Sequence, residues 1–257
     1  MSKKSFGIIL TALLTVSGSA FADTFYFAAP PPGGVAWEGV YVNPYTANET
    51  SPLTINGLTI YCDDWDTEFS GNPTWNATVL AVTPGNVSNF KFGGATTTQS
   101  VSLLGTVGSY SLQYGTPVST TAYDLYLEAV YLDQTMQGLG SNAQTQQEEL
   151  SAAEWMLFTS SGASSLLSDI NASGSAFADD VYTYLGDAHT ALVSHDINPA
   201  GWSVITPVDN TFPMQEFLVD DSPGTLNGPN VPEPSAVILL GTVVGLLGWT
   251  KLRRRQA

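Results

Sequence analysis

The side chains best suited to chemistry lie in one short acidic stretch, residues 61–68, with the sequence YCDDWDTE. In an extended strand, Cys62 and the acidic residues at the following alternate positions share one face. Carboxylates on one face repel one another unless a cation or solvent screens them, and calcium prefers carboxylate oxygens as ligands. The stretch therefore suggests either a calcium site on Asp64, Asp66 and Glu68 or a solvated strand face, and it lacks the glycine-containing frame of an EF-hand.

Cys62 is the only cysteine of the chain, so an intrachain disulfide is excluded. A buried thiol, an intermolecular bridge and an acyl linkage all stay open. His189 and His195 fall on different faces of a helix and have no third ligand at a matching spacing, so they do not predict a metal site. The chain contains no nucleophile elbow, zinc-protease motif, P-loop or nucleotide fingerprint, and we predict that it is not an enzyme.

The elements that must position these side chains are mostly strands. Runs of β-branched and aromatic residues, bounded by proline, glycine and asparagine, indicate strands on both sides of a more helical region. The predicted strands cover residues 24–27, 35–42, 53–61, 74–83, 202–208 and 216–219. Residues 93–115 are rich in threonine, serine and glycine, which favours short strands and loops.

A helical insertion over about residues 119–194 interrupts the strands. Its first helix has an apolar stripe at a spacing of three and four residues, formed by Ala122, Leu125, Ala129, Leu132 and Met136. Thr145 and Glu148 have the spacing of a capping box, which predicts that a second helix begins there. A third helix is predicted over 176–194. These patterns predict the α+β class, a β-rich, sandwich-like ectodomain over residues 23–221 that carries the helical insertion.

The tryptophans suit two different roles. Tryptophan stacks on sugar rings, but it also fills the interior of β structures. In this β-rich frame we predict that most of them lie in the core. The set comprises Trp37, Trp65, Trp75, Trp155 and Trp202.

Both ends of the chain carry the pattern of an exported protein. Residues 1–22 join a basic start, an apolar run and an Ala-Phe-Ala end, as in a secretory signal peptide. After a linker at 222–231, a helix over 235–252 would span roughly 27 Å, close to a hydrocarbon core of about 30 Å. The arginines that follow it are expected to stay in the cytoplasm, which places the ectodomain outside.

The part between these ends is strongly acidic. All of the chain's 23 acidic residues except Glu233 lie in residues 23–231, where Lys91 is the only lysine or arginine. Such a charge makes nucleic acid and anionic lipid surfaces poor partners. Cations, cationic surfaces and neutral glycans remain as partners.

The C-terminal segment, residues 232–257, resembles the PEP-CTERM sorting signal of Gram-negative bacteria. The resemblance rests on the order of Pro232, Glu233 and Pro234, an apolar span, and a cluster of Arg253, Arg254 and Arg255 at the end. It implies that the membrane enzyme exosortase recognises the Pro-Glu-Pro region and processes the protein during export. The implied partners are exosortase and the inner membrane.

The ectodomain resembles a recurrent PEP-CTERM ectodomain and the thioester domains of Gram-positive surface adhesins. The motifs are Tyr-Cys-x-Asp at 61–64, the two helical stretches at 126–132 and 152–158, and the stretch 213–218, which is similar to the closing strand. The resemblance implies a thioester between Cys62 and a glutamine at the helical position that Ser151 holds here. A hydroxyl forms no thioester, and Gln147, one turn earlier, is a weaker substitute. We therefore expect a free, buried Cys62 thiol and a vestigial Cys62–Ser151 site.

These observations predict an exported structural protein of the cell surface or extracellular matrix, linked to exopolysaccharide and biofilm. It would be anchored in the inner membrane before processing and would need no cofactor, with calcium as the one cofactor still considered. The alternative is a calcium- or carbohydrate-binding module. A glycoside hydrolase that acts through two carboxylates ranks third.

Overall fold

The computed structural model describes most of the expected ectodomain. The described residues are 22–29, 36–38, 40–51, 54–65, 67, 73–93, 121–139, 143–159, 163–208 and 214–221. Residues 22–229 form one compact unit. The predicted signal peptide (except Ala22), the linker and the sorting signal with its apolar helix lie outside the described residues, as do most of residues 93–115. Within the part that is described, no helix has both the length and the apolar character needed to cross a bilayer.

Six antiparallel strands close into a barrel in the order β1-β4-β5-β8-β7-β6. Their bounds are β1 Asp23–Ala29, β4 Tyr45–Ser51, β5 Ile55–Cys62, β6 Thr74–Ala81, β7 Trp202–Pro207 and β8 Phe217–Asp220. Because β1 pairs with both β4 and β6, neither side of this sheet is left open. The mixed α+β class is thus confirmed, whereas the sandwich-like arrangement is corrected to a closed barrel. Alternating burial is common to both arrangements, so the sequence pattern does not separate them.

The barrel interior is filled by residues that alternate along the strands. Phe25 and Phe27 of β1, Ile60 of β5 and Phe217 of β8 all point inward and are almost completely buried. The three phenylalanine rings pack against the rings of Trp75 and Tyr45. This interior is the smaller of two hydrophobic cores, and Cys62 belongs to it.

Two parts of the β structure differ from the prediction. The predicted strand at 35–42 is a short hairpin of two strands, β2 Ala36–Trp37 and β3 Val40–Tyr41, in a separate sheet. Strand β4, with the sequence YTANETS, was not predicted. Its middle is polar, and Glu49 occupies an inward, buried position, so it does not show the apolar alternation of a half-buried strand.

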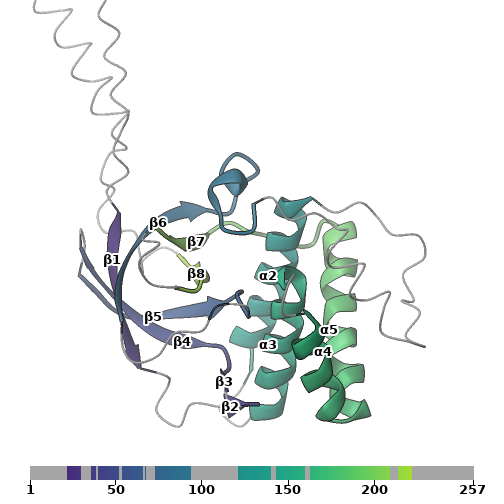
Figure 1. The fold of residues 1–257 in the computed structure, drawn as a ribbon. Helices are drawn as coiled ribbons and strands as arrows, with labels where there is room; N and C mark the ends of the chain where they lie inside the picture. The colour runs from purple at the N-terminus through teal and green to yellow at the C-terminus, as the bar shows by residue number, and fades with distance from the viewer. Residues whose placement is uncertain are drawn as a thin grey trace, which may run out of the picture. The chain divides into compact units, whose positions relative to one another are not determined.

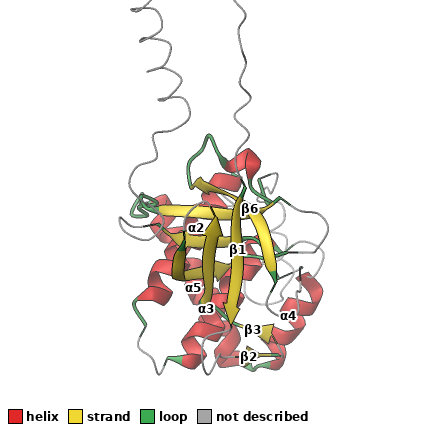
Figure 2. Cartoon of the chain, turned by 90° about the vertical axis from the view of Figure 1, so that its left-hand side faces the viewer, coloured by secondary structure: helices red, strands yellow, loops and turns green. Residues whose placement is uncertain are grey.

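Helices form a second layer beside the barrel (Figure 1). They are α2 Ala122–Gln137, α3 Gln144–Phe158, α4 Ala163–Ala172 and α5 Ser175–Val193. Figure 2, turned by 90°, shows the strands lying over the helices. The helical insertion is confirmed, and all five residues of the predicted stripe on α2 are buried. Helix α4, which packs against α3 and α5, was not predicted.

The helix starts do not follow the predicted capping. Helix α3 begins at Gln144, and its N-cap residue, Ala143, makes no side-chain capping bond, so the predicted capping box at Thr145 is wrong. A capping box does occur at α2, where the Thr121 hydroxyl accepts from the Asp124 N–H and the Asp124 carboxylate accepts from the Thr121 N–H. Both boxes have suitable residues, but only Thr121 has the extended backbone that an N-cap requires.

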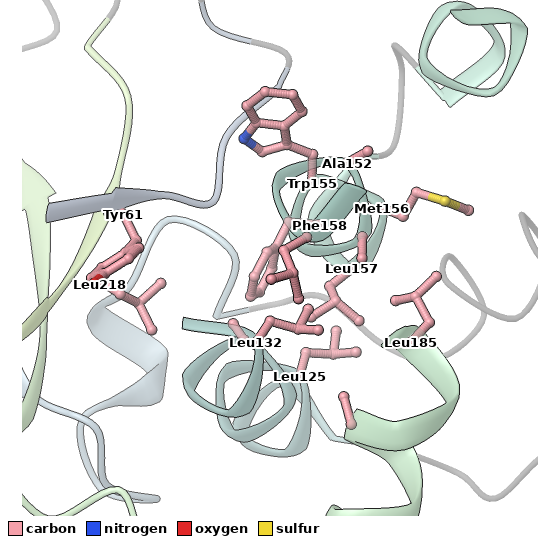
Figure 3. Packing of buried hydrophobic residues seen from close by; sticks show 14 of the residues in the cluster. Tyr61, Leu125, Leu132, Ala152, Trp155, Met156, Leu157, Phe158, Leu185 and Leu218 are labelled. Carbon is pink, nitrogen blue, oxygen red and sulfur yellow. The ribbon is translucent and has the colours of Figure 1, made fainter. Parts of the chain in front are cut away.

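The larger hydrophobic core lies between the barrel wall and the helices. Tyr61 of β5 and Leu218 of β8 lie on the side of the helices in Figure 3, and they belong to the same core cluster as Leu132 and Phe158. Residues 149–158 of α3 are all buried, because α2 and α5 pack against this helix and Trp155 contacts the end of β5. Helix α3 therefore fixes how the helical layer sits on the end of β5.

Candidate functional site: the buried thiol at the end of strand β5

Cys62 is the last residue of β5, and it is completely buried. The chain turns directly after it, so that the Asp64 N–H donates to Sγ at 3.4 Å and the thiol lies 3.5 Å from the Asp64 carbonyl oxygen. Burial, followed by the neighbouring Asp64 and Asp63 charges, raises the pKa of the Cys62 thiol. The thiol is therefore protonated at neutral pH and needs a proton acceptor before it can act as a nucleophile.

Asn43 holds the backbone of Cys62 with its carboxamide. Its Oδ1 accepts from the Cys62 N–H at 2.6 Å, and its Nδ2 donates to the Cys62 carbonyl at 3.1 Å. Asn43 is itself 1% exposed. The strand end is thus fixed in a place where water does not satisfy the backbone groups.

Three residues on one face of α3 also form hydrogen bonds with Asn43 or Cys62. Ser151 Oγ accepts from the Asn43 N–H at 3.0 Å. Glu154 Oε2 accepts from Asn43 Nδ2 at 2.6 Å. Trp155 Nε1 donates to the Cys62 carbonyl at 2.8 Å. Residues three and four positions apart project to the same side of a helix, which explains why this single helix reaches both Asn43 and Cys62.

Cys62 and Ser151, the predicted pair, both contact Asn43 in the fold, but the Ser151 hydroxyl forms its hydrogen bonds with backbone groups. Its hydroxyl accepts from Asn43 and donates to the Gln147 carbonyl at 2.7 Å. The hydroxyl therefore positions the strand end through Asn43. The resemblance correctly placed α3 beside the cysteine, but it did not identify a partner for the sulfur.

A carboxamide that the sequence analysis missed lies close to the thiol. Gln215 Nε2 donates to the Asp64 carbonyl oxygen at 2.9 Å, and this is the same oxygen that the Cys62 thiol approaches. The thiol and the carboxamide are therefore joined through one shared oxygen. The cause is the antiparallel pairing of β5 with β8, in which Cys62 stands opposite Phe217. Continuing this register by two residues brings Gln215 opposite Asp64.

Of the three predicted cation ligands, the structure describes Asp64. The Asp64 carboxylate is buried and forms an ion pair with Lys91 Nζ, which also donates to Thr67 Oγ1 at 2.7 Å. Asp66 and Glu68 lie outside the described residues. Among the residues that are described, no group of three or more histidine, cysteine or acidic side chains is placed to hold a metal ion. The partner of Asp64 in this structure is thus an ammonium group.

Four further carboxyl groups are buried around the end of β5, namely Asp63, Asp133, Glu154 and Glu216. Glu216 accepts from the Tyr126 hydroxyl, from Thr206 Oγ1 and from the Lys91 N–H. Burial is the largest cause that raises the pKa of each of the four carboxyls. The site is therefore a buried acidic environment around a thiol and a carboxamide.

The tryptophans mostly lie in the cores, as predicted. Trp37, Trp75, Trp155 and Trp202 are buried, and Trp65 is the half-buried one among the tryptophans that the structure describes. Trp65 packs against Trp155 with ring centroids 5.0 Å apart. These rings support the helix–barrel contact, and their burial leaves little of their faces for stacking on sugars.

The described residues thus define an α+β domain in which a closed barrel and a helical layer enclose a buried cysteine. No family model matches the chain, and no curated protein matches it. Among solved structures, the chain is similar to the N-terminal domain of the Streptococcus pyogenes pilus tip adhesin Cpa, with 12% sequence identity and a TM-score of 0.41. The match covers 79% of this chain and 94% of that one.

Proposed function

We propose that this protein is an exported protein of the cell surface or extracellular matrix, processed by exosortase, whose ectodomain attaches covalently to amine-bearing partners. The export and sorting part rests on the two ends of the sequence. The attachment part rests on the hydrogen bonds of the Cys62 thiol and the Gln215 carboxamide to one carbonyl oxygen. The ectodomain would belong to matrix that is rich in exopolysaccharide, and it would act once per molecule rather than as an enzyme.

The chemistry of the attachment has two steps. Cys62 Sγ first bonds to the Gln215 carboxamide carbon, and the C–N bond breaks, so that the thiol proton leaves with the amide group as ammonia. A primary amine of the partner then attacks the thioester carbon. An amide forms between the partner and the Gln215 side chain, and the proton lost from the amine returns to Cys62 as a thiol. No oxidant or reductant is needed.

The surroundings of Cys62 suit a thioester. An ionised thiolate is disfavoured there by burial and by nearby carboxylates, whereas a thioester carries no charge. Burial also keeps water away from the reactive carbonyl. The carboxyl groups around the site can take the thiol proton and return one to the departing ammonia.

The intact mass of residues 22–229 tests this attachment. We expect a mass lower than that of the sequence by about 17 Da, the loss of one ammonia, and no reaction with thiol reagents until an amine such as methylamine is added. The Gln215→Glu variant, which keeps the shape but not the amide, should have its full mass and one thiol on denaturation. Ser151→Ala and Gln147→Ala are the matched controls, and both should keep the loss.

Other outcomes are equally informative. A full mass in the wild type, with one thiol appearing on denaturation, would leave the domain a non-covalent scaffold with the free thiol that the sequence suggested. A mass loss that survives in Gln215→Glu but disappears in Gln147→Ala would assign the bond to the helix instead.

Sorting is tested at the other end of the protein. Deletion of Pro232–Pro234 should leave the protein exported but held in the inner membrane at its unprocessed mass, because exosortase would lack its recognition region. Replacing Arg253, Arg254 and Arg255 by serine should weaken retention of the tail on the cytoplasmic side. Fractionation and immunoblotting of cells measure both effects. Unchanged processing in the deletion variant would refute the sorting role.

A further inference from the structure

The pair formed by Asp133 of α2 and Glu154 of α3 is the strongest unexplained feature of the helical layer. Both side chains are 0% exposed. They lie on helices that pack against each other, and each carboxyl affects the pKa of the other. Both oxygens of Asp133 and Oε1 of Glu154 nevertheless have no donor from any other described group. Since ionised carboxylates only accept hydrogen bonds, the two carboxyls form a hydrogen bond with each other only when the pair holds a proton.

Among the described residues, no lysine or arginine is free to replace that proton. The groups that face the pair from the neighbouring elements are acids, neutral hydroxyls, the thiol and one carboxamide, namely Asn43, Tyr45, Tyr61, Cys62 and Asp63. Lys91, the only lysine or arginine of residues 23–231, is engaged with Asp64 and Thr67. His189 of α5 contacts Glu128, another residue of α2. Two buried negative charges without a counter-ion are strongly unfavourable.

We propose that Asp133 and Glu154 share a proton and act as a pH-sensitive clasp that holds α2 and α3 together over the end of β5. Glu154 is the member that connects the clasp to the thiol, because it accepts from Asn43, which in turn holds both backbone groups of Cys62. Loss of the proton places two like charges in the buried contact, which drives α3 away from α2. The hydrogen bonds from α3 to Asn43 and Cys62 are then weakened.

The sign of the pH dependence follows from linkage. Burial raises the pKa of both carboxyls in the folded protein, while in the unfolded chain they titrate near about 4. Between those two values the folded state binds more protons than the unfolded state, so the stability contributed by this pair is full in acid and is lost as pH rises toward the folded pKa. Burial also raises the pKa of Asp63 and Glu216, which gives a slope of the same sign, so the pair is identified by a difference between variants.

The experiment compares the melting temperature of residues 22–229, which form one compact unit containing both cores, between about pH 5 and about pH 9. The variants are Asp133→Asn and Glu154→Gln, each of which supplies an amide donor to the remaining carboxyl. We expect both to melt several degrees higher than the wild type at the alkaline end and to show a flatter decline with pH. Asp187→Asn, at an exposed position of α5, is the matched control and should follow the wild-type curve.

Two further measurements decide the mechanism. The infrared spectrum of the wild type at neutral pH should contain the C=O stretch of a protonated carboxyl, and Asp133→Asn should remove it. This result does not depend on the melting temperature of the variant. Hydrogen exchange in α3 should accelerate as pH rises beyond its intrinsic pH dependence, and Glu154→Gln should abolish the excess. Parallel curves for the wild type and both amide variants, or a calcium-dependent rise in melting temperature that Asp133→Asn abolishes, would overturn the shared proton.

Discussion

Alanine in place of Trp155 should lower the free energy of unfolding of residues 22–229 by about 3–5 kcal/mol, which is the usual range for truncating a large buried aromatic side chain. The indole is 2% exposed. It stacks on Trp37 at 6.3 Å and packs against Trp65 at 5.0 Å between ring centroids. The same residue donates to the Cys62 carbonyl, so the variant also leaves that oxygen without its indole donor. Urea titration followed by circular dichroism measures the change.

Phenylalanine at the same position separates the two contributions. Trp155→Phe keeps an aromatic ring in the core but removes the N–H. It should cost about 1–3 kcal/mol, for one lost buried hydrogen bond together with a smaller ring, because the Cys62 carbonyl keeps its bond from Asn43 Nδ2. A loss as large as that of the alanine variant would mean that the hydrogen bond to Cys62, and not the packing, dominates. A loss below about 1 kcal/mol for alanine would contradict the position of Trp155 in the core.

Asn43→Ala is expected to have the second largest effect, a loss of about 3 kcal/mol, because the buried Cys62 N–H and Glu154 Oε2 lose this partner and the Cys62 carbonyl loses one of its two donors. Its carboxamide serves the Cys62 N–H, the Cys62 carbonyl and Glu154 Oε2. None of these groups has access to water in its place, since Asn43, Cys62 and Glu154 are all buried. The same urea titration measures the loss.

Asn48 provides a matched control from strand β4. Its Oδ1 also accepts from a backbone N–H, that of Gly57 at 2.8 Å, but this bond is exposed to solvent. Asn48→Ala should therefore cost only about 0.5 kcal/mol, because water replaces the lost acceptor. Equal losses in the two variants would show that burial does not set the value of these bonds.

Local patterns in the sequence were sufficient for α2, α3 and α5 and for most of the strands, but not for α4. The stripe from Ala122 to Met136 has the period of an α-helix, and the tertiary contacts bury that same stripe. Strand β4 escaped because YTANETS has few residues that favour strands, and its barrel neighbours supply the stabilisation. Closure of the barrel depends on β1 pairing with β6, which no local pattern encodes.

The residues of the site were also predicted only in part. Cys62 and the helix that carries Trp155 were identified from short motifs, and they do meet. Gln215 was not identified, although its segment had been noted, because it joins Asp64 across 151 residues of sequence through the pairing of β5 with β8. Asn43 stands before a proline, and this pattern indicates only a turn. Its role comes from the contact with α3, which lies 111 residues further along the chain at Glu154.

The place of Gln215 directly before β8 also has a mechanical consequence. An amine that opens the proposed thioester remains bonded to Gln215, and the segment expected to anchor the protein follows β8 in the chain. Tension between a captured partner and the cell would therefore run along Phe217–Asp220 and bypass the other strands and the helices. The ladders from β5 and β7 on either side resist sliding of this strand. The covalent bonds of one short segment would thus carry the load. The protein would keep its partner under fluid flow even if the rest of the domain unfolded.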